Sequence, residues 1–208
     1  LAAGIGEIHL GQPVESLPPR GGIIEVVSGT LTGVYDQVVL ACHSDQSRNI
    51  LAEHYPSHAR LLQQIPYQPN RAVLHSDASM LPRRQSLWSA WNYQSGNGVL
   101  SDRPVAVHYL INRLQPLPTK TPVIVSLNPL QEPDPAKVHG EFHYSHPVFT
   151  RHATAIQRHI QASNGRNGVW LAGAWLGYGF HEDGLASALR VARQLNAVAP
   201  WKALADAA

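Results

Sequence analysis

The sequence predicts an α/β protein that also contains a separate antiparallel sheet, and three stretches of the chain support this. Residues 168–195 combine an apolar strand, a glycine-rich loop and an amphipathic helix. α/β proteins use this arrangement to present backbone amides to a nucleotide-like ligand. Between residues 70 and 146, short strand-like segments alternate with turns, which favours an antiparallel sheet. Residues 13–42 add a third group of strands.

The strands near the N-terminus are expected at residues 13–17, 22–28 and 33–42, separated by the turn sequences PPRGG and SGTLTG. The later sheet is predicted from five segments, namely RAVLH, SLWSAWNY, VAVHYLINRL, PVIVSLN and EFHYS. Gly96-Asn97-Gly98 indicates a hairpin turn between the second and third of these segments.

Three helices are expected between the strands. Ser44 is a suitable N-cap for a helix that reaches about His54, and Ser57 for a second helix. Thr150 is a suitable N-cap for a third helix, which Gly165 stops. The expected apolar faces of the second and third helices are Leu61, Leu62 and Ile65, and Ala153, Ile156 and Ile160.

The glycine-rich loop is the leading candidate for a ligand-binding element. It holds four glycines, more than a tight connection needs: Gly173, Gly177, Gly179 and Gly184. The following helix is predicted to begin at Asp183 or Gly184, so that its first amides suit an anion or an electron-rich carbonyl oxygen. The expected packing face of this helix comprises Leu185, Ala188, Leu189, Ala192 and Leu195.

Several motifs, in the same order along the chain, resemble the flavin-containing amine oxidase superfamily. In particular, the chain resembles a bacterial group described as predicted NAD/FAD-binding, amine-oxidase-like proteins, over nearly its whole length. The residues that carry the resemblance are the run GVWLAGAWLGYGFHEDGLASALRVARQL (168–195) and the segments 35–47, 64–84, 88–93, 111–117, 125–129 and 144–149.

The resemblance implies FAD as the cofactor. It implies that Val14 lies beside the adenine and that the strand ending at Ala41 finishes near the cofactor. It also implies that Gly173, Ala174 and Trp175 approach the pyrophosphate and the ribityl chain. The positions that would present a helix N-terminus to the flavin pyrimidine carbonyl are Asp183, Gly184 and Leu185. Many members of the superfamily carry an acidic residue where this chain has Ala174, so one contact with the cofactor would be absent.

The fold implied by the resemblance is part of an FAD/NAD(P)-binding Rossmann-like domain together with an antiparallel-sheet substrate domain. Residues 1–45 would form the β-meander portion of the FAD domain, residues 46–150 the substrate domain, and residues 151–208 the C-terminal strand and helix of the FAD domain.

The G-x-G-x-x-G turn that holds the ADP pyrophosphate in such flavoproteins has no match in the chain. The nearest sequence is Gly4-Ile5-Gly6, which has His9 in place of the third glycine and no strand before it. We therefore expect this chain to be the C-terminal part of a longer protein, whose N-terminal segment is its partner in the cofactor domain. The chain alone is expected to bind FAD poorly and to be inactive.

Composition excludes several functional classes. The net charge is +2 with neutral histidines, and there is no basic stripe, which argues against nucleic-acid binding. Cys42 is the only cysteine, so no intrachain disulfide can form, and a reducing, cytoplasmic location is expected. No apolar run approaches the roughly 18 residues of a membrane span, and no signal-peptide pattern is found. The expected partner is a small-molecule substrate.

Aromatic residues offer candidates for a substrate pocket, chiefly Trp91, Tyr178 and Phe180, because amine-oxidising relatives hold their substrate between aromatic rings. The alternative is that these rings fill the space between two domains. In a strand, Trp91 and Tyr93 share one face while Trp88 takes the other, so only part of the set can line one pocket.

Histidines raise the question of a metal site. On a helix, His139, His143 and His146 would share a face and could bind the zinc of a metal hydrolase. The polar–aromatic alternation around them indicates a strand, on which His146 points away from the other two, so we expect no metal. His43 and His181 lie at strand or loop ends near the presumed flavin and could transfer protons, or serve only as surface polarity.

The sequence therefore favours an FAD-dependent oxidoreductase of the amine-oxidase-like type, in which hydride passes from substrate to flavin. No catalytic side chain is identified, because the flavin itself carries the redox step. The alternative is a non-catalytic ligand-binding or scaffold protein that keeps the flavoprotein fold. Amine oxidases commonly place a lysine near the flavin, and none of Lys120, Lys137 and Lys202 matches that position. Arg71 could bind an anionic substrate group or lie in solvent.

Overall fold

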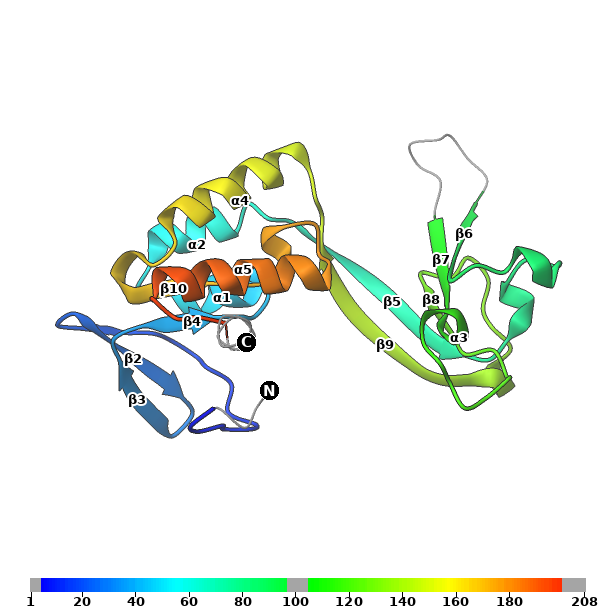
Figure 1. Cartoon of the computed structure of the whole chain (residues 1–208), viewed down its shortest axis with the longest axis horizontal. Helices are drawn as coiled ribbons and strands as arrows, with labels where there is room; N and C mark the ends of the chain where they lie inside the picture. The colour runs from blue at the N-terminus through cyan, green and yellow to red at the C-terminus, as the bar shows by residue number, and fades with distance from the viewer. Residues whose placement is uncertain (1–4, 97–104, 200–208) are drawn as a thin grey trace, which may run out of the picture. The chain divides into compact units, whose positions relative to one another are not determined.

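The computed structural model describes residues 5–96 and 105–199, which form two compact units (Figure 1). The first unit combines the chain up to Tyr67 with the chain from Pro147 onward, and the second is Gln68–His146. These limits differ from the expected division at residues 46 and 150. Helices α1 (Ser44–Leu51) and α2 (Pro56–Leu62) belong to the first unit, because their apolar side chains lie in its core.

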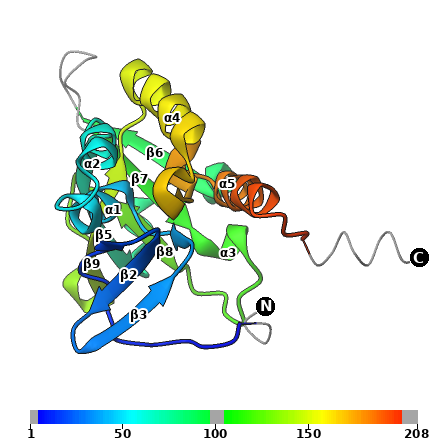
Figure 2. The ribbon, with the colours of Figure 1, turned by 90° about the vertical axis from the view of Figure 1, so that its left-hand side faces the viewer.

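The N-terminal strands form an antiparallel meander of β1 (Pro19–Arg20), β2 (Ile23–Ser28) and β3 (Leu31–Tyr35) in that order. Figure 2 shows β2 and β3 side by side. The expected strand at residues 33–42 is divided: β3 ends at Tyr35, and β4 (Val38–Leu40) enters another sheet. The expected strand at residues 13–17 contributes only the bridge from Ser16 to Val27.

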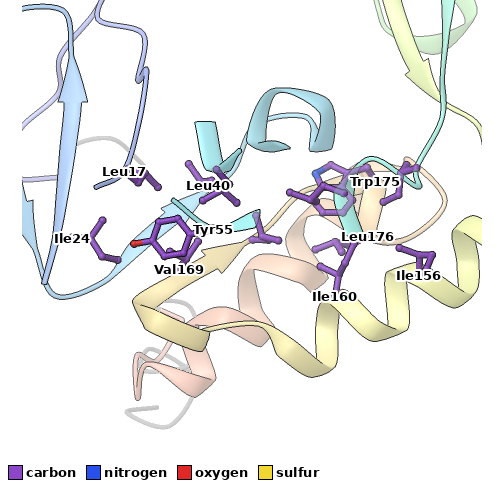
Figure 3. Close-up of a cluster of buried hydrophobic side chains, with 13 residues drawn as sticks. Leu17, Ile24, Leu40, Tyr55, Ile156, Ile160, Val169, Trp175 and Leu176 are labelled. Atoms are coloured by element: carbon purple, nitrogen blue, oxygen red, sulfur yellow. The ribbon is translucent and has the colours of Figure 1, made fainter. Parts of the chain in front are cut away.

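Strand β4 pairs in parallel with β10 (Val169–Leu171), with Val39 opposite Trp170. Around this pair, one cluster of buried side chains fills the first unit (Figure 3). It comprises Leu17, Ile24, Leu40, Leu51, Tyr55, Leu62, Ile65, Ile156, Ile160, Val169, Leu171, Trp175 and Leu176. The meander, both helices after β4 and the C-terminal segments therefore share one core.

Helix α4 (Arg151–Ser163) confirms the sequence prediction at both ends. The Thr150 hydroxyl accepts a hydrogen bond from the Ala153 amide at 3.0 Å, as an N-cap should, and Gly165 follows the helix with φ +85°. The expected apolar face, Ala153, Ile156 and Ile160, is buried. At α1, by contrast, Ser44 is the first helical residue and His43 occupies the cap position.

Helix α5 (His181–Gln194) corrects the predicted packing face. Its buried residues are Ser187 and Val191, whereas the exposed fractions of Leu185 and Leu195 are 41% and 37%. The small Ser187 side chain lets the helix approach the glycine loop, and its hydroxyl group is hydrogen-bonded there. Hydrophobic periodicity alone could not identify this small, partly polar face.

The second unit is a five-stranded sheet in the order β6-β7-β8-β5-β9. Its strands are β5 (Tyr67–His75), β6 (Trp91–Ser95), β7 (Val105–Leu110), β8 (Ile124–Leu127) and β9 (Val138–Pro147). Strands β6, β7, β8 and β5 pair antiparallel, which confirms the predicted sheet. The end of VAVHYLINRL is the short helix α3 (Ile111–Leu114), and the start of SLWSAWNY is a 3₁₀ turn. The predicted turn at Gly96-Asn97-Gly98 extends beyond the described residues.

Side chains alternate along each strand, and the register of the strands gathers them into two different faces of the sheet. One face carries a hydrogen-bonded polar row from His75 on β5 through Ser126 on β8 and His108 on β7 to Gln94 on β6. The opposite face carries partly exposed apolar and aromatic side chains. These are Leu74, Trp91, Tyr93, Val105, Val107, Tyr109, Val125 and Leu127.

One backbone donor sets the tautomer of His75 at the start of the polar row. The Asp77 amide donates to Nδ1 of His75 at 3.1 Å, so this imidazole carries its proton on Nε2 and donates to Ser126 Oγ at 2.7 Å. The Ser126 hydroxyl also bonds to Nδ1 of His108 at 2.6 Å, and Nε2 of His108 bonds to Gln94 Oε1 at 3.0 Å. Because its Nδ1 accepts a hydrogen bond, the buried His75 is neutral.

We expect the polar row to make the stability of the second unit pH-dependent. Burial lowers the pKa of both His75 and His108, so each contributes its full stability above the unfolded-state pKa of about 6.5. That contribution falls as the pH drops below this value and each imidazole takes up a proton. Urea unfolding at neutral pH and at about pH 5 measures the difference.

A Ser126→Ala variant tests how much the polar row stabilises the second unit. It leaves one buried ring nitrogen of His75 and one of His108 unsatisfied, and should lower the free energy of unfolding by roughly 2–4 kcal/mol. The matched Ser95→Ala change, at an exposed position on β6, should stay within about 0.5 kcal/mol. Equal effects of the two changes would show that the row carries no special stability.

Candidate functional site

The candidate site lies where the parallel strands β4 and β10 end, because the carboxyl ends of parallel strands are where α/β proteins bind ligands. Ala41 and Cys42 follow β4, and Gly173 follows β10. The indole Nε1 of Trp175 donates to the carbonyl oxygen of Cys42 at 3.1 Å, which ties the two strand ends together. The Gly173 amide donates to Ser187 Oγ at 2.8 Å, which ties β10 to α5.

The glycine loop is held in place by side chains of helix α4. Gln157 Nε2 donates to the carbonyl oxygens of Trp175 and Gly177, each at 2.8 Å. Gln161 Nε2 donates to the carbonyl oxygen of Leu176 at 2.9 Å. Because three successive carbonyls are bound from one side, the loop has a fixed backbone shape before any ligand arrives.

Asp183 holds the other end of the loop. Its Oδ2 accepts from the amides of Tyr178 and Phe180, each at 3.0 Å. Helix α5 begins at His181, two residues before the predicted start, and Asp183 is the third residue of its first turn.

The earlier helix start changes which amides face outward. The amides of Asp183 and Gly184 donate to the carbonyl oxygen of Phe180 at 3.0 and 3.2 Å. In the described part of the chain, the amides of His181 and Glu182 donate to no protein group. These two amides, rather than those of Asp183 and Gly184, are available to a ligand.

Two glycines leave no room for a side chain. A Cβ atom at Gly173, where φ is +154°, would lie 2.5 Å from Nε1 of Trp175. A Cβ atom at Gly177 would overlap the carboxylate of Asp183. Gly184 differs, since a Cβ there would lie 3.7 Å from its nearest neighbour, the Ala174 nitrogen. Gly173 and Gly177 are thus required by the close packing around the loop.

The remaining predicted cofactor residues are placed as follows. Val14 is half-buried and, together with Cys42, lines a cavity of about 390 Å³ beside α1. Ala41 is exposed, and Ala174 is half-buried. The Trp175 side chain is 3% exposed and belongs to the core, so only its backbone could contact a ligand. Leu185 lies one turn inside α5.

The aromatic candidates lie in different units. Tyr178 and Phe180 are exposed in the glycine loop, where the Tyr178 ring packs edge-on against Phe149 at 6.1 Å. Trp91 lies on the apolar face of the second unit and packs edge-on against Tyr109 at 5.8 Å. As predicted, Tyr93 shares this face with Trp91.

Other candidates from the sequence are explained by local contacts. His139, His143 and His146 lie on strand β9, and the described residues hold no group of three possible metal ligands. Arg71 forms paired contacts at 2.8–2.9 Å with Glu132 and 2.8 Å with Glu141, so its guanidinium is already occupied. His43 and His181 are exposed near the candidate site.

Three residues around the site were not identified from the sequence. Gln157 and Gln161 could have been suspected only as a polar pair four residues apart on an otherwise apolar helix face. Tyr67 accepts hydrogen bonds from the amide and hydroxyl groups of Ser44 at 2.9 and 3.0 Å, and its ring lies 5.4 Å from that of His43. Burial raises the pKa of the Tyr67 phenol.

Comparisons with known proteins were made by family, sequence and structure. No protein-family model matches the chain, and no curated protein matches it in sequence. Among solved structures, a protein assigned as a protoporphyrinogen oxidase from Exiguobacterium sp. 255-15 is 12% identical, with a TM-score of 0.54 over 91% of this chain and 48% of its own. A CLA-producing fatty acid isomerase from P. acnes is 10% identical, with a TM-score of 0.57 over 88% of this chain and 47% of its own.

A third structure, cyclohexylamine oxidase from Brevibacterium oxydans IH-35A, is 13% identical with a TM-score of 0.48 over 89% of this chain and 49% of its own. The first two confirm that the chain has the fold expected from the resemblance, with helices and an antiparallel sheet. The chain spans about half the length of the structures it matches.

A membrane-crossing helix is not found in the described residues, since none of their helices is both long and apolar enough.

Replacing Gly177 should damage the loop, whereas replacing Gly184 should not. A methyl group at Gly177 displaces the Asp183 carboxylate from two amides, so Gly177→Ala should lower the free energy of unfolding by roughly 1–3 kcal/mol. Gly184→Ala meets only ordinary contacts inside a helix and should raise it by about 0.5–1 kcal/mol. Urea unfolding distinguishes them, and equal losses in both variants would contradict this account.

Proposed function

We propose that this chain contributes to an FAD-dependent oxidoreductase of the amine-oxidase-like type. The first unit would supply part of a Rossmann-like cofactor domain, and the second unit the substrate domain. The reaction class is hydride transfer from a small-molecule substrate to the flavin, which supplies the redox chemistry when bound. The single cysteine agrees with a cytoplasmic location.

The observation that carries this proposal is the glycine loop between β10 and α5. Its carbonyls are fixed by Gln157 and Gln161, while two amides at the start of α5 remain without protein partners in the described chain. Such amides, at the positive end of a helix, suit the carbonyl oxygen of a flavin pyrimidine ring. The residues present therefore fit the flavin end of FAD, and they hold their shape without it.

The adenosine end of FAD has weaker support in this chain. Val14 and Cys42 line one cavity beside the β4 end, as a position near the adenine would require. Parallel strands are normally covered on both faces, yet Val39 on β4 is 45% exposed and Leu185 on α5 is 41% exposed. We propose that the ADP-binding part of the cofactor domain covers these apolar side chains.

Substrate contact is assigned to the apolar face of the second unit's sheet. Trp91 and Tyr93 remain 47% and 69% exposed there, and neighbouring positions on β7 and β8 are only half-buried. The described side chains of this face carry no charge, so it suits an apolar part of a substrate better than an anionic one. Arg71, occupied by two carboxylates, would not bind the substrate.

A non-catalytic ligand-binding protein with the same fold is the second candidate. None of the three lysines matches the position of the lysine that amine oxidases place near the flavin, and Lys137 pairs with Asp77 at 3.2 Å and Asp134 at 3.4 Å. Ala174 likewise offers no acidic group to the cofactor. These two observations favour loss of amine oxidation in particular and leave other hydride donors possible.

The absorbance spectrum of the purified full-length protein tests the proposal first. We expect the two visible-range bands of oxidised flavin, and loss of those bands when a substrate is added without oxygen. Flavin that is bound but never reduced by any substrate or chemical reductant would favour the binding protein. A colourless protein that also ignores added FAD would exclude the oxidoreductase.

Removal of a single amide tests the flavin contact itself. His181→Pro deletes the first amide of α5 at a position where proline suits a helix, and Phe180 already has the extended backbone that a following proline requires. Loss of one hydrogen bond to a neutral carbonyl should weaken FAD binding by about two- to tenfold. His181→Ala, which keeps the amide, should bind FAD normally; equal weakening in both would implicate the imidazole instead.

A further inference from the structure

A second cavity in the first unit lies on the far side of β10 from the glycine loop. Its volume is about 510 Å³, and it opens between the α1–α2 connection and the segment that links α4 to β10. The residues that line it include Tyr55, Ser57 and His58 from the first region, and Ser163 and Arg166 from the second. Arg166 precedes β10, whereas Gly173 of the candidate flavin site follows it.

Two buried polar atoms of residues that line this cavity lack partners. Among the described residues, only three buried side-chain oxygen or nitrogen atoms make no hydrogen bond, and two of them are Tyr55 Oη and His58 Nε2. Tyr55 is 5% exposed. Orphaned buried polar groups are rare and cost free energy, so a ligand that reached these two atoms through the cavity would gain affinity by satisfying them.

The charges at the cavity favour an anion. The Arg166 guanidinium pairs with no carboxylate in the described chain, and Ser57 and Ser163 add hydroxyl donors. In the described chain, one lining side chain forms an ion pair, between Nε2 of His54 and the exposed Glu53 carboxylate at 3.8 Å. Arginine, histidine and hydroxyl side chains are the groups that proteins use to bind oxyanions.

We propose that this cavity binds the oxyanion group of a small organic anion, a phosphate ester or a carboxylate, through Arg166, Tyr55 and His58. The site is independent of the flavin site, because the two lie at opposite ends of β10 and share none of these residues. A cavity of about 510 Å³ leaves room for the organic part of such a ligand beside its charged group.

The pKa of the His58 imidazole should report whether an anion occupies the cavity. Burial, and then the positive charge of Arg166, lower the pKa of the His58 imidazole below its ordinary value. An anion bound between the two groups would offset that charge and accept a hydrogen bond from Nε2. Anion binding should therefore raise the pKa of His58, which the pH dependence of its ring resonance measures.

The experiment titrates the full-length protein with inorganic phosphate, and separately with acetate, at constant ionic strength. The NMR resonance of the His58 ring, assigned with a His58→Gln variant, reports binding. We expect a saturable shift with at least one anion; phosphate alone points to a phosphate ester, and acetate to a carboxylate. Absence of a saturable shift with both anions would overturn the proposal.

Three variants distinguish specific anion binding in the cavity from nonspecific attraction of anions to positive charges on the surface. Arg166→Gln should weaken binding by at least about tenfold, because it removes a charge-assisted hydrogen bond. Tyr55→Phe should weaken binding by about two- to tenfold without impairing the fold, since the lost hydroxyl has no protein partner. Arg60→Gln removes the same charge from an exposed position on α2 and should leave binding unchanged. Equal weakening by Arg166→Gln and Arg60→Gln would also overturn the proposal.

Discussion

The parallel pairing of β4 with β10 is the interaction on which the first unit depends. Each strand has three residues, and about 130 positions of chain separate them. Two such short strands are not stable alone, so their pairing relies on the side chains around them. Val169 and Leu171 are fully or almost fully buried in the same cluster as residues of the meander, α1, α2 and α4. The pairing in turn brings the ends of both strands to one place.

Side-chain hydrogen bonds then give the loop beyond β10 its shape. Trp175 bonds to the β4 end, Gln157 and Gln161 bind the loop carbonyls, and Asp183 binds two loop amides. Each of these groups satisfies backbone that would otherwise need water, so the loop is ordered by the fold itself. A preorganised backbone surface of this kind loses little entropy when a cofactor binds.

The second unit uses polar contacts differently. Its row from His75 through Ser126 and His108 to Gln94 crosses four neighbouring strands on one face, and the Asp77 amide sets the tautomer of His75 within it. This row resists slippage of the strands, because a shift of one residue would leave several buried groups unpaired. The opposite face carries aromatic side chains that pack incompletely, among them Trp91 and Tyr93.

The sequence by itself determined the elements whose signals are local. Thr150 and Gly165 marked the ends of α4, turn residues marked the meander, and strand alternation placed Trp91 and Tyr93 on one face. Tertiary structure alone decided that strand 33–42 divides near Asp36, that Ser187 rather than Leu185 faces the core, and that α5 begins at His181. In each of these cases the contact that sets the feature is made with a residue distant in sequence or with a polar group. Neither kind of contact changes the spacing of apolar residues along the chain, so hydrophobic periodicity does not reveal it.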